Sequence, residues 1–246
     1  MKEPREEHEW FGHRLEKVFV VGLDGNRIPC DCIWPKDRTN PVPWILTTHG
    51  ATSSKHEWTE IDGFTKGGNI TRDLADSGIA VVAMDLRYHG DNDTRRSPGL
   101  DIFEGDNWEK FFEKSVEDIH AVIAHFAADP VVDPARMGYA GYSMAGIFGF
   151  WLSNRGVPFK TMALGVPGVN RGKSSIYSTY NNLENVSGIP VLQVSAENDE
   201  YVPFEEAKWL FDQIPAKDKK FLSYPSGHSL PTEYVQEFVH WLRSNL

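Results

Sequence analysis

Short apolar runs recur along this chain and are separated by longer segments of mixed polarity. The run at 79–84 has no polar alternation, which is typical of a strand buried on both faces of a parallel sheet. The same pattern, or alternation with a period of two, predicts further strands. These lie at 17–21, 28–34, 44–48, 137–142, 161–166, 190–195 and 221–224.

Helices are predicted between most of these strands. In the segment 107–128 the apolar residues recur every three or four positions, and Asp129-Pro130 ends the pattern. Shorter helices are predicted at 69–77, 144–152, 204–213 and 232–242. The segment 23–27 contains Asp-Gly between two extended runs, which predicts a hairpin.

Alternation of strands and helices indicates the α/β class. We predict a mostly parallel eight-stranded sheet with an antiparallel N-terminal edge and helices on both faces. Residues 1–16 are charged and are interpreted as a lead-in with at most one helical turn. No internal repeat or linker is evident, so 1–246 is predicted to form a single domain.

Charge and composition narrow the function. The chain has 25 basic and 35 acidic residues and a net charge of −10, which disfavours nucleic acid or an anionic membrane as partner. No apolar run approaches the roughly 18 residues of a membrane span. Cys30 and Cys32 are too close for a good disulfide, and thiols fit a reducing, cytoplasmic location. The histidines are scattered, so neither a metal site nor a cofactor is expected.

The segment Met137-Gly-Tyr-Ala-Gly-Tyr-Ser-Met-Ala-Gly146 places Ser143 between a buried strand and an apolar helix. Such a junction can lift a serine hydroxyl above the edge of a sheet. Gly141, Ala145 and Gly146 are small, as the close approach of strand and helix requires. Taken alone, the segment could equally be a loop serine on a glycine-rich turn.

Other strands deliver chemically useful residues to the same edge, because functional groups gather at the carboxyl ends of the strands in an open α/β sheet. The predicted strand ending at 195 is followed by Glu197, Asp199 and Glu200, and the one ending at 224 is followed by His228. A serine, a carboxylate and an imidazole therefore follow one another along the chain.

In this order of residues the chain resembles the α/β-hydrolases, from about residue 17 to the C-terminus. The matching segments are Gly141–Ala145, His49-Gly50, Ala196–Pro203 and Gly227-His228. The stretch Asp85-Leu-Arg-Tyr-His-Gly90 is similar to a family pattern that commonly has glycine at the position of Tyr88. Ala145, where the family pattern ends in glycine, is a second departure.

The resemblance implies roles for these residues. Ser143 would be the nucleophile, His228 its general base and Asp199 the carboxylate that orients the imidazole, with Glu197 as the alternative carboxylate. The backbone N–H groups of Ala51 and Met144 would bind the oxyanion. His49 would serve the geometry of its loop rather than the chemistry.

The resemblance is nearest to capless serine esterases of the dienelactone-hydrolase-like and acyl-peptidase-like branches, although the former often have cysteine at the position of Ser143. Only 23 residues, 167–189, are available where large lids are commonly inserted, so no large cap domain is expected. A small-molecule ester is the expected partner, and the oligomeric state stays open. Candidate substrate-binding residues are Trp58, Phe64, Tyr142 and Tyr201.

Alternatives remain within and outside this class. Thioester, amide or carbon–carbon bond hydrolysis would use the same three side chains, and a ligand-binding receptor could keep them with little turnover. Asp85 and Arg87 are interpreted as a structural ion pair or turn. Arg95 and Arg96 are either solvated or bind an acidic group of the substrate.

Overall fold

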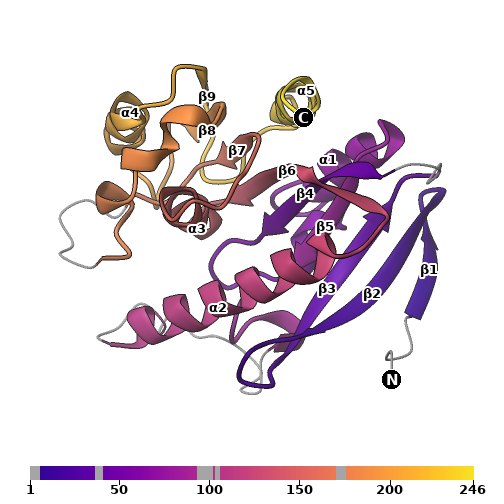
Figure 1. The fold of residues 1–246 in the computed structure, drawn as a ribbon. Helices are drawn as coiled ribbons and strands as arrows, with labels where there is room; N and C mark the ends of the chain where they lie inside the picture. The colour runs from indigo at the N-terminus through magenta and orange to yellow at the C-terminus, as the bar shows by residue number, and fades with distance from the viewer. Residues whose placement is uncertain (1–5, 37–40, 93–101, 103–105, 170–175) are drawn as a thin grey trace.

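The computed structural model describes residues 6–36, 41–92, 102, 106–169 and 176–246. In these residues nine strands form one sheet, in the order β1-β2-β3-β5-β4-β6-β7-β8-β9 (Figure 1). The strands are β1 (Glu6–Trp10), β2 (His13–Val21), β3 (Arg27–Trp34), β4 (Val42–Thr48), β5 (Ala80–Met84), β6 (Val132–Tyr142), β7 (Met162–Gly165), β8 (Val191–Ala196) and β9 (Lys219–Tyr224). The pairs β1–β2, β2–β3 and β3–β5 are antiparallel. All other neighbouring strands, from β5 across β4 to β9 at the far edge, are parallel. The predicted mostly parallel sheet with an antiparallel N-terminal edge is confirmed.

The prediction for residues 1–16 is wrong where the structure describes them. Residues 6–10 form β1 and pair with β2, with Glu6 opposite Lys17 and Trp10 opposite His13. Phe11 and Gly12, with φ of 48° and 79°, form the two-residue turn between the strands, as a tight hairpin requires. The side chains of β1 are mostly exposed and charged, so this edge strand has no apolar alternation to reveal it, and the sheet has nine strands instead of eight.

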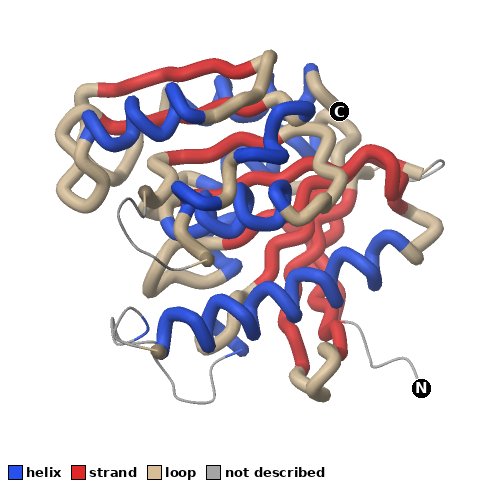
Figure 2. The backbone as a smooth tube through the Cα atoms, turned by 60° about the vertical axis from the view of Figure 1, so that its left-hand side comes forward, coloured by secondary structure: helices blue, strands red, loops and turns tan. Residues whose placement is uncertain are grey.

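Helices cover both faces of the sheet, as predicted (Figures 1 and 2). Successive residues of β4 point to opposite faces, because side chains alternate along a strand. The helices are α1 (Gly67–Asp76), α2 (Asn107–Ala127), α3 (Met144–Asn154), α4 (Phe204–Gln213) and α5 (Tyr234–Ser244). Trp44 and Leu46 pack in a core with α2, α3 and α4, whereas Ile45 packs in a second core with α1 and α5.

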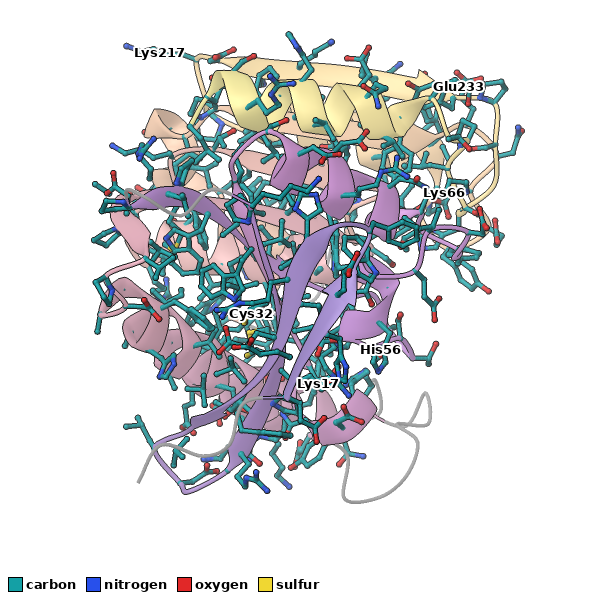
Figure 3. All side chains as sticks on the ribbon, turned by 90° about the vertical axis from the view of Figure 1, so that its right-hand side faces the viewer. Lys17, Cys32, His56, Lys66, Lys217 and Glu233 are labelled. Carbon is teal, nitrogen blue, oxygen red and sulfur yellow. The ribbon has the colours of Figure 1, made fainter. Side chains whose placement is uncertain are left out.

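The two cysteines lie on β3, where both are buried and no disulfide joins them. Cys32, labelled in Figure 3, lies inside the body of the protein. Among the described helices, none has the length and apolar character needed to cross a membrane.

Candidate active site

Ser143 occupies a sharp turn between the last residue of β6 and the first residue of α3. Its φ of 56° and ψ of −117° lie outside the regions that residues with a side chain usually adopt. The turn is held because Ser143 N–H donates to the carbonyl of Gly165 (2.8 Å) and its own carbonyl accepts from the N–H of Gly146 (2.9 Å). Strain of this kind is common where a side chain has to be presented for chemistry.

The small residues around Ser143 are required by close packing. A Cβ added to Gly141 would lie 2.9 Å from the Cβ of Ala145, and one added to Gly146 would lie 2.4 Å from the Cβ of Pro167. Contacts this short are not tolerated between carbon atoms. The contact of Gly141 with Ala145 agrees with the sequence-based explanation that strand and helix pack closely. Gly146 is small because α3 packs against Pro167, in the segment after β7.

His228 lies against Ser143, although 85 residues separate them in the chain. The distance between His228 Nε2 and Ser143 Oγ is 2.9 Å, and the histidine side chain is buried. In this position the imidazole can accept the hydroxyl proton.

Asp199 contacts the other imidazole nitrogen. The distances from His228 Nδ1 to the two carboxylate oxygens are 2.9 and 2.8 Å. Burial alone would raise the pKa of Asp199. Hydrogen bonds from His228 and from the N–H groups of Val202 and Tyr201 outweigh burial and hold this pKa below its ordinary value. An ionised Asp199 keeps the proton of a neutral imidazole on Nδ1, so Nε2 faces Ser143 as an acceptor.

The neighbouring carboxylates have other partners. Glu197 accepts a hydrogen bond from the hydroxyl of Ser223 (2.8 Å) at an exposed position. Glu200 accepts from the backbone N–H of His228 (3.0 Å) and so stabilises the loop that carries the imidazole. The structure therefore brings Asp199, and not Glu197, to the imidazole.

Tyr142 and Trp58 are buried, so the sequence-based prediction that they line a substrate pocket is not supported. Tyr142 donates from its hydroxyl to the carbonyl of His228 (2.6 Å) and accepts from the N–H of Leu230 (3.0 Å). Trp58 donates from its indole N–H to the carbonyl of Thr48 (3.0 Å). Aromatic side chains with a polar end commonly pack in this way inside a protein. Both residues hold loops of the site in place.

Phe64 and Tyr201 are exposed beside His228. Their ring centroids lie 6.3 and 5.0 Å from that of the imidazole. Both side chains are more than half exposed, so they can contact a ligand that reaches Ser143. Arg95 and Arg96 lie outside the described residues.

The loop after β4 passes directly over Ser143. A Cβ added to Gly50 would lie 3.5 Å from the Cβ of Ser143, so the backbone of this loop borders the nucleophile. His49 is fully buried. It accepts from the N–H of Leu86 at Nε2 (3.1 Å), so the proton of the neutral ring lies on Nδ1 and is donated to the carbonyl of Gly50 (2.8 Å). Burial lowers the pKa of His49 well below its ordinary value. One ring nitrogen contacts the loop after β4 and the other contacts the segment after β5, so both are used in holding the backbone.

Two charged residues of the same loop were not singled out in the sequence analysis. Lys55 is buried and bonds the carboxylates of Asp85 (3.0 Å) and Asp91 (2.6 Å), which ties the loop after β4 to the loop after β5. Of the two interpretations of Asp85 and Arg87, the turn is present, because the N–H of His89 donates to the carbonyl of Leu86 (3.1 Å). The ion pair is wrong, because Arg87 pairs with Asp118 (2.7 Å) and Asp85 with Lys55. These partners come from segments far apart in sequence, so no local pattern indicates them.

Glu57, on the short helix η1 (Lys55–Trp58), is the second of these residues. It is buried, and its carboxylate oxygens lie 3.3 and 3.4 Å from the backbone nitrogen of Gly50. Figure 3 shows His56 and Lys66, which flank this part of the chain, on one side of the molecule. A lone Glu in a polar loop carries no sequence signal of burial.

Tyr88 has a φ of 64°, in the left-handed region that glycine adopts most easily. This explains why the family pattern commonly has glycine at that position. Gly90 cannot change in the same way, because an added Cβ would lie 2.4 Å from a carboxylate oxygen of Asp85. The described residues contain no group of three or more His, Cys, Asp or Glu placed to hold a metal ion.

Comparison with known proteins gives the same picture of the fold. Residues 56–237 match the family described as "Dienelactone hydrolase family". A Bacillus subtilis (strain 168) protein named "Putative esterase YitV" is 27% identical over 134 residues, which are 54% of this chain and 46% of that protein. The chain thus matches about half the length of this curated relative.

Two solved structures share the α/β-hydrolase fold. A cold-adapted esterase from an Arctic intertidal metagenomic library superposes with a TM-score of 0.75 and is 21% identical. The superposition covers 98% of this chain and 97% of the esterase chain. Acetyl xylan esterase 1 from Thermoanaerobacterium sp. JW/SL YS485 also has a TM-score of 0.75, with 17% identity, covering 98% of this chain and 87% of its own.

Proposed function

Because the chain belongs to the dienelactone hydrolase family, we propose that it is a serine hydrolase that cleaves small to medium carboxylic esters through an acyl-enzyme intermediate. The observation that carries this proposal is the contact of His228 Nε2 with Ser143 Oγ at 2.9 Å, with Asp199 on the opposite ring nitrogen. The names of the relatives, which are esterases, support the same bond type.

In the first half of the reaction Ser143 Oγ attacks the ester carbonyl carbon while its proton passes to His228 Nε2. The tetrahedral intermediate then collapses: the bond to the leaving oxygen breaks, and the alcohol departs with the proton from Nε2. The acyl group remains on Ser143. Asp199 stabilises the imidazolium that forms in between.

In the second half a water molecule attacks the acyl carbon and gives a proton to His228 Nε2. The bond to Ser143 Oγ breaks, the serine regains the proton, and the carboxylic acid leaves. The net reaction consumes one ester and one water and yields one acid and one alcohol, so no oxidant or cofactor is required.

The oxyanion would be bound by the backbone N–H groups of Met144 and Ala51. Met144 is the first residue of α3, where the N–H groups have no partner within the helix and the helix dipole favours negative charge. Ala51 follows Gly50 in the loop that borders Ser143. Loss of one such donor typically costs about 10² to 10³ in rate.

The absence of a large cap is supported by the short connection between β7 and β8. Its described part contains only the short helices η4 (Thr179–Asn181) and η5 (Glu184–Gly188). This fits a single domain over 1–246 without a large cap. Phe64 and Tyr201 are proposed to contact the substrate. The buried thiols of β3 fit a cytoplasmic location.

Hydrolysis of p-nitrophenyl acetate and butyrate tests the proposal. Wild type should turn over repeatedly and be labelled at Ser143 by a fluorophosphonate, and Ser143→Ala should lose both. Ser187→Ala, at an exposed serine of η5, is the matched control and should behave as wild type. The proposal is wrong if Ser143→Ala hydrolyses these esters as fast as wild type. Labelling without turnover on a panel of esters would favour a binding protein.

A further inference from the structure

We propose that Glu57 is a positioning residue of this site, which fixes the His49–Gly50 peptide and through it helps to orient the next peptide, whose Ala51 N–H is offered to the oxyanion. The inference rests on the proposed ester hydrolysis and adds to it a residue outside the Ser143, His228 and Asp199 set. The carboxylate of Glu57 accepts a hydrogen bond from Gly50 N–H, at 3.3 and 3.4 Å from its two oxygens.

The backbone of Gly50 lies between the carboxyl group of Glu57 and Ser143. An added Cβ on Gly50 would lie 3.5 Å from the Cβ of Ser143 and 3.9 Å from Oε2 of Glu57. A glycine backbone has wide freedom in φ and ψ, so its orientation has to be set by hydrogen bonds rather than by its own sterics.

Both peptide groups of Gly50 are held. Its N–H donates to Glu57, and its carbonyl accepts from His49 Nδ1 (2.8 Å) and from Ser53 N–H (3.3 Å). In a trans peptide the N–H of the next residue points opposite to the carbonyl. Fixing Gly50 on both sides therefore fixes the direction of the Ala51 N–H.

Glu57 itself is held rigidly, as a positioning residue must be. Its backbone N–H donates to the carbonyl of Ser54 (3.1 Å), and its carbonyl accepts from the hydroxyl of Thr65 (3.2 Å). Gly67, at the start of α1, packs so closely that an added Cβ would lie 2.4 Å from the carbonyl oxygen of Glu57. The backbone of Glu57 is therefore held by the N-terminal end of α1 and the residues before it.

The charge of Glu57 matters because only the Gly50 backbone separates its carboxyl group from Ser143. Burial raises the pKa of Glu57 to about 8, against hydrogen bonds from the Ser53 side chain and Gly50 N–H that lower it. The other ionisable groups that act on it are Glu60, from the same loop, and the phenols of Tyr142 and Tyr234. Below pH 8 the carboxyl group is neutral and holds Gly50 without repelling the oxyanion.

Three variants test this role with p-nitrophenyl acetate. Glu57→Gln keeps an oxygen acceptor for Gly50 N–H without a titratable group, Glu57→Ala removes the acceptor, and Glu60→Gln removes an exposed carboxylate of the same loop. We expect Glu57→Ala to lose about tenfold to a hundredfold in kcat with little change in KM, because a misplaced donor acts on the transition state. Glu57→Gln should restore kcat, and Glu60→Gln should match the wild-type kcat at pH 7. Because the charge of Glu60 raises the pKa of Glu57, the alkaline decline of Glu60→Gln should begin at a lower pH than that of wild type.

The pH profile separates positioning from a purely structural role. In wild type, ionisation of Glu57 should lower kcat as the pH rises through about 8, and Glu57→Gln should lack this decline. An alkaline decline in Glu57→Gln equal to that of wild type, or a wild-type kcat in Glu57→Ala, would overturn the inference. If Glu57→Ala does not fold, the profile of Glu57→Gln decides alone.

The same experiment distinguishes this inference from the function on which it rests. Absence of turnover in wild type, or full turnover in Ser143→Ala, means that the proposed hydrolase function fails. An active wild type and an inactive Ser143→Ala, combined with Glu57 variants indistinguishable from wild type, mean that only the role of Glu57 fails.

Discussion

The phenol of Tyr142 donates a hydrogen bond to the backbone carbonyl of His228, at a distance of 2.6 Å. Tyr142 directly precedes Ser143 in the chain, so the strand that presents the hydroxyl also anchors the loop that presents the imidazole. The same phenol oxygen accepts from the N–H of Leu230 (3.0 Å). The end of β6 therefore positions both residues: it carries Ser143 directly, and it holds the His228 loop through the Tyr142 hydroxyl.

Tyr142→Phe should weaken both the fold and the proposed reaction. It leaves a buried carbonyl and a buried N–H without their partner, at a cost of about 1–3 kcal/mol each. The free energy of unfolding from denaturant titration and kcat should both fall. Tyr180→Phe, at an exposed tyrosine, is the control. A Tyr142→Phe protein with wild-type stability and kcat would contradict this anchoring role.

Asp199→Asn should abolish most of the activity while leaving the fold intact. An amide at this position no longer secures the Nδ1 proton, and the proposed mechanism predicts a loss in kcat on the order of 10⁴. Glu197→Gln should retain wild-type kcat, because Glu197 contacts Ser223 instead of the imidazole. Steady-state kinetics of both variants measure this, with circular dichroism to check folding. If Glu197→Gln lost activity and Asp199→Asn kept it, Glu197 and not Asp199 would be the carboxylate that orients the imidazole.

Gly146→Ala should destabilise the turn at Ser143. The added Cβ would lie 2.4 Å from the Cβ of Pro167 and 2.9 Å from its Cα, so α3 and the segment that follows β7 must move apart. Overpacking of this kind typically costs about 1–3 kcal/mol. Gly188→Ala is the matched control, because an added Cβ there meets nothing within 4 Å. Thermal unfolding of the two variants should show a drop in Tm for Gly146→Ala alone.

The buried carboxyl group of Glu57 should make stability depend on pH. Its pKa is raised in the folded protein from an ordinary 4.5 to about 8, so the folded state holds the proton more tightly than the unfolded state. The contribution of Glu57 to stability is then highest below about pH 4.5 and decreases as the pH rises to about 8, by roughly 1.4 kcal/mol per unit of pKa shift. The difference in unfolding free energy between wild type and Glu57→Gln should change in this window. A constant difference from pH 5 to 9 would argue against a buried, neutral Glu57.

Most of the sheet was predictable because buried parallel strands need uninterrupted apolar runs. The run 79–84 is an example: it contains β5, which is fully buried and lies between β4, its parallel neighbour, and β3, its antiparallel neighbour. β1 could not be predicted, because its side chains face solvent at the edge of the sheet and its stability comes from backbone pairing with β2. Backbone pairing does not require apolar side chains, so the hydrophobic pattern of the sequence does not indicate it.

The sequence by itself determined the order in which a serine, a carboxylate and an imidazole emerge at one edge of an α/β sheet, and the small residues that allow a tight turn at Ser143. Only the tertiary structure decided which side chains meet. Asp199 and Glu197 lie two residues apart in one turn, yet only Asp199 reaches the imidazole, and Tyr142 and Glu57 face inward. Local pattern specifies which elements form. Contacts between residues far apart in the sequence depend on strand register and on the packing of loops against the sheet. No single segment of the sequence determines either of these.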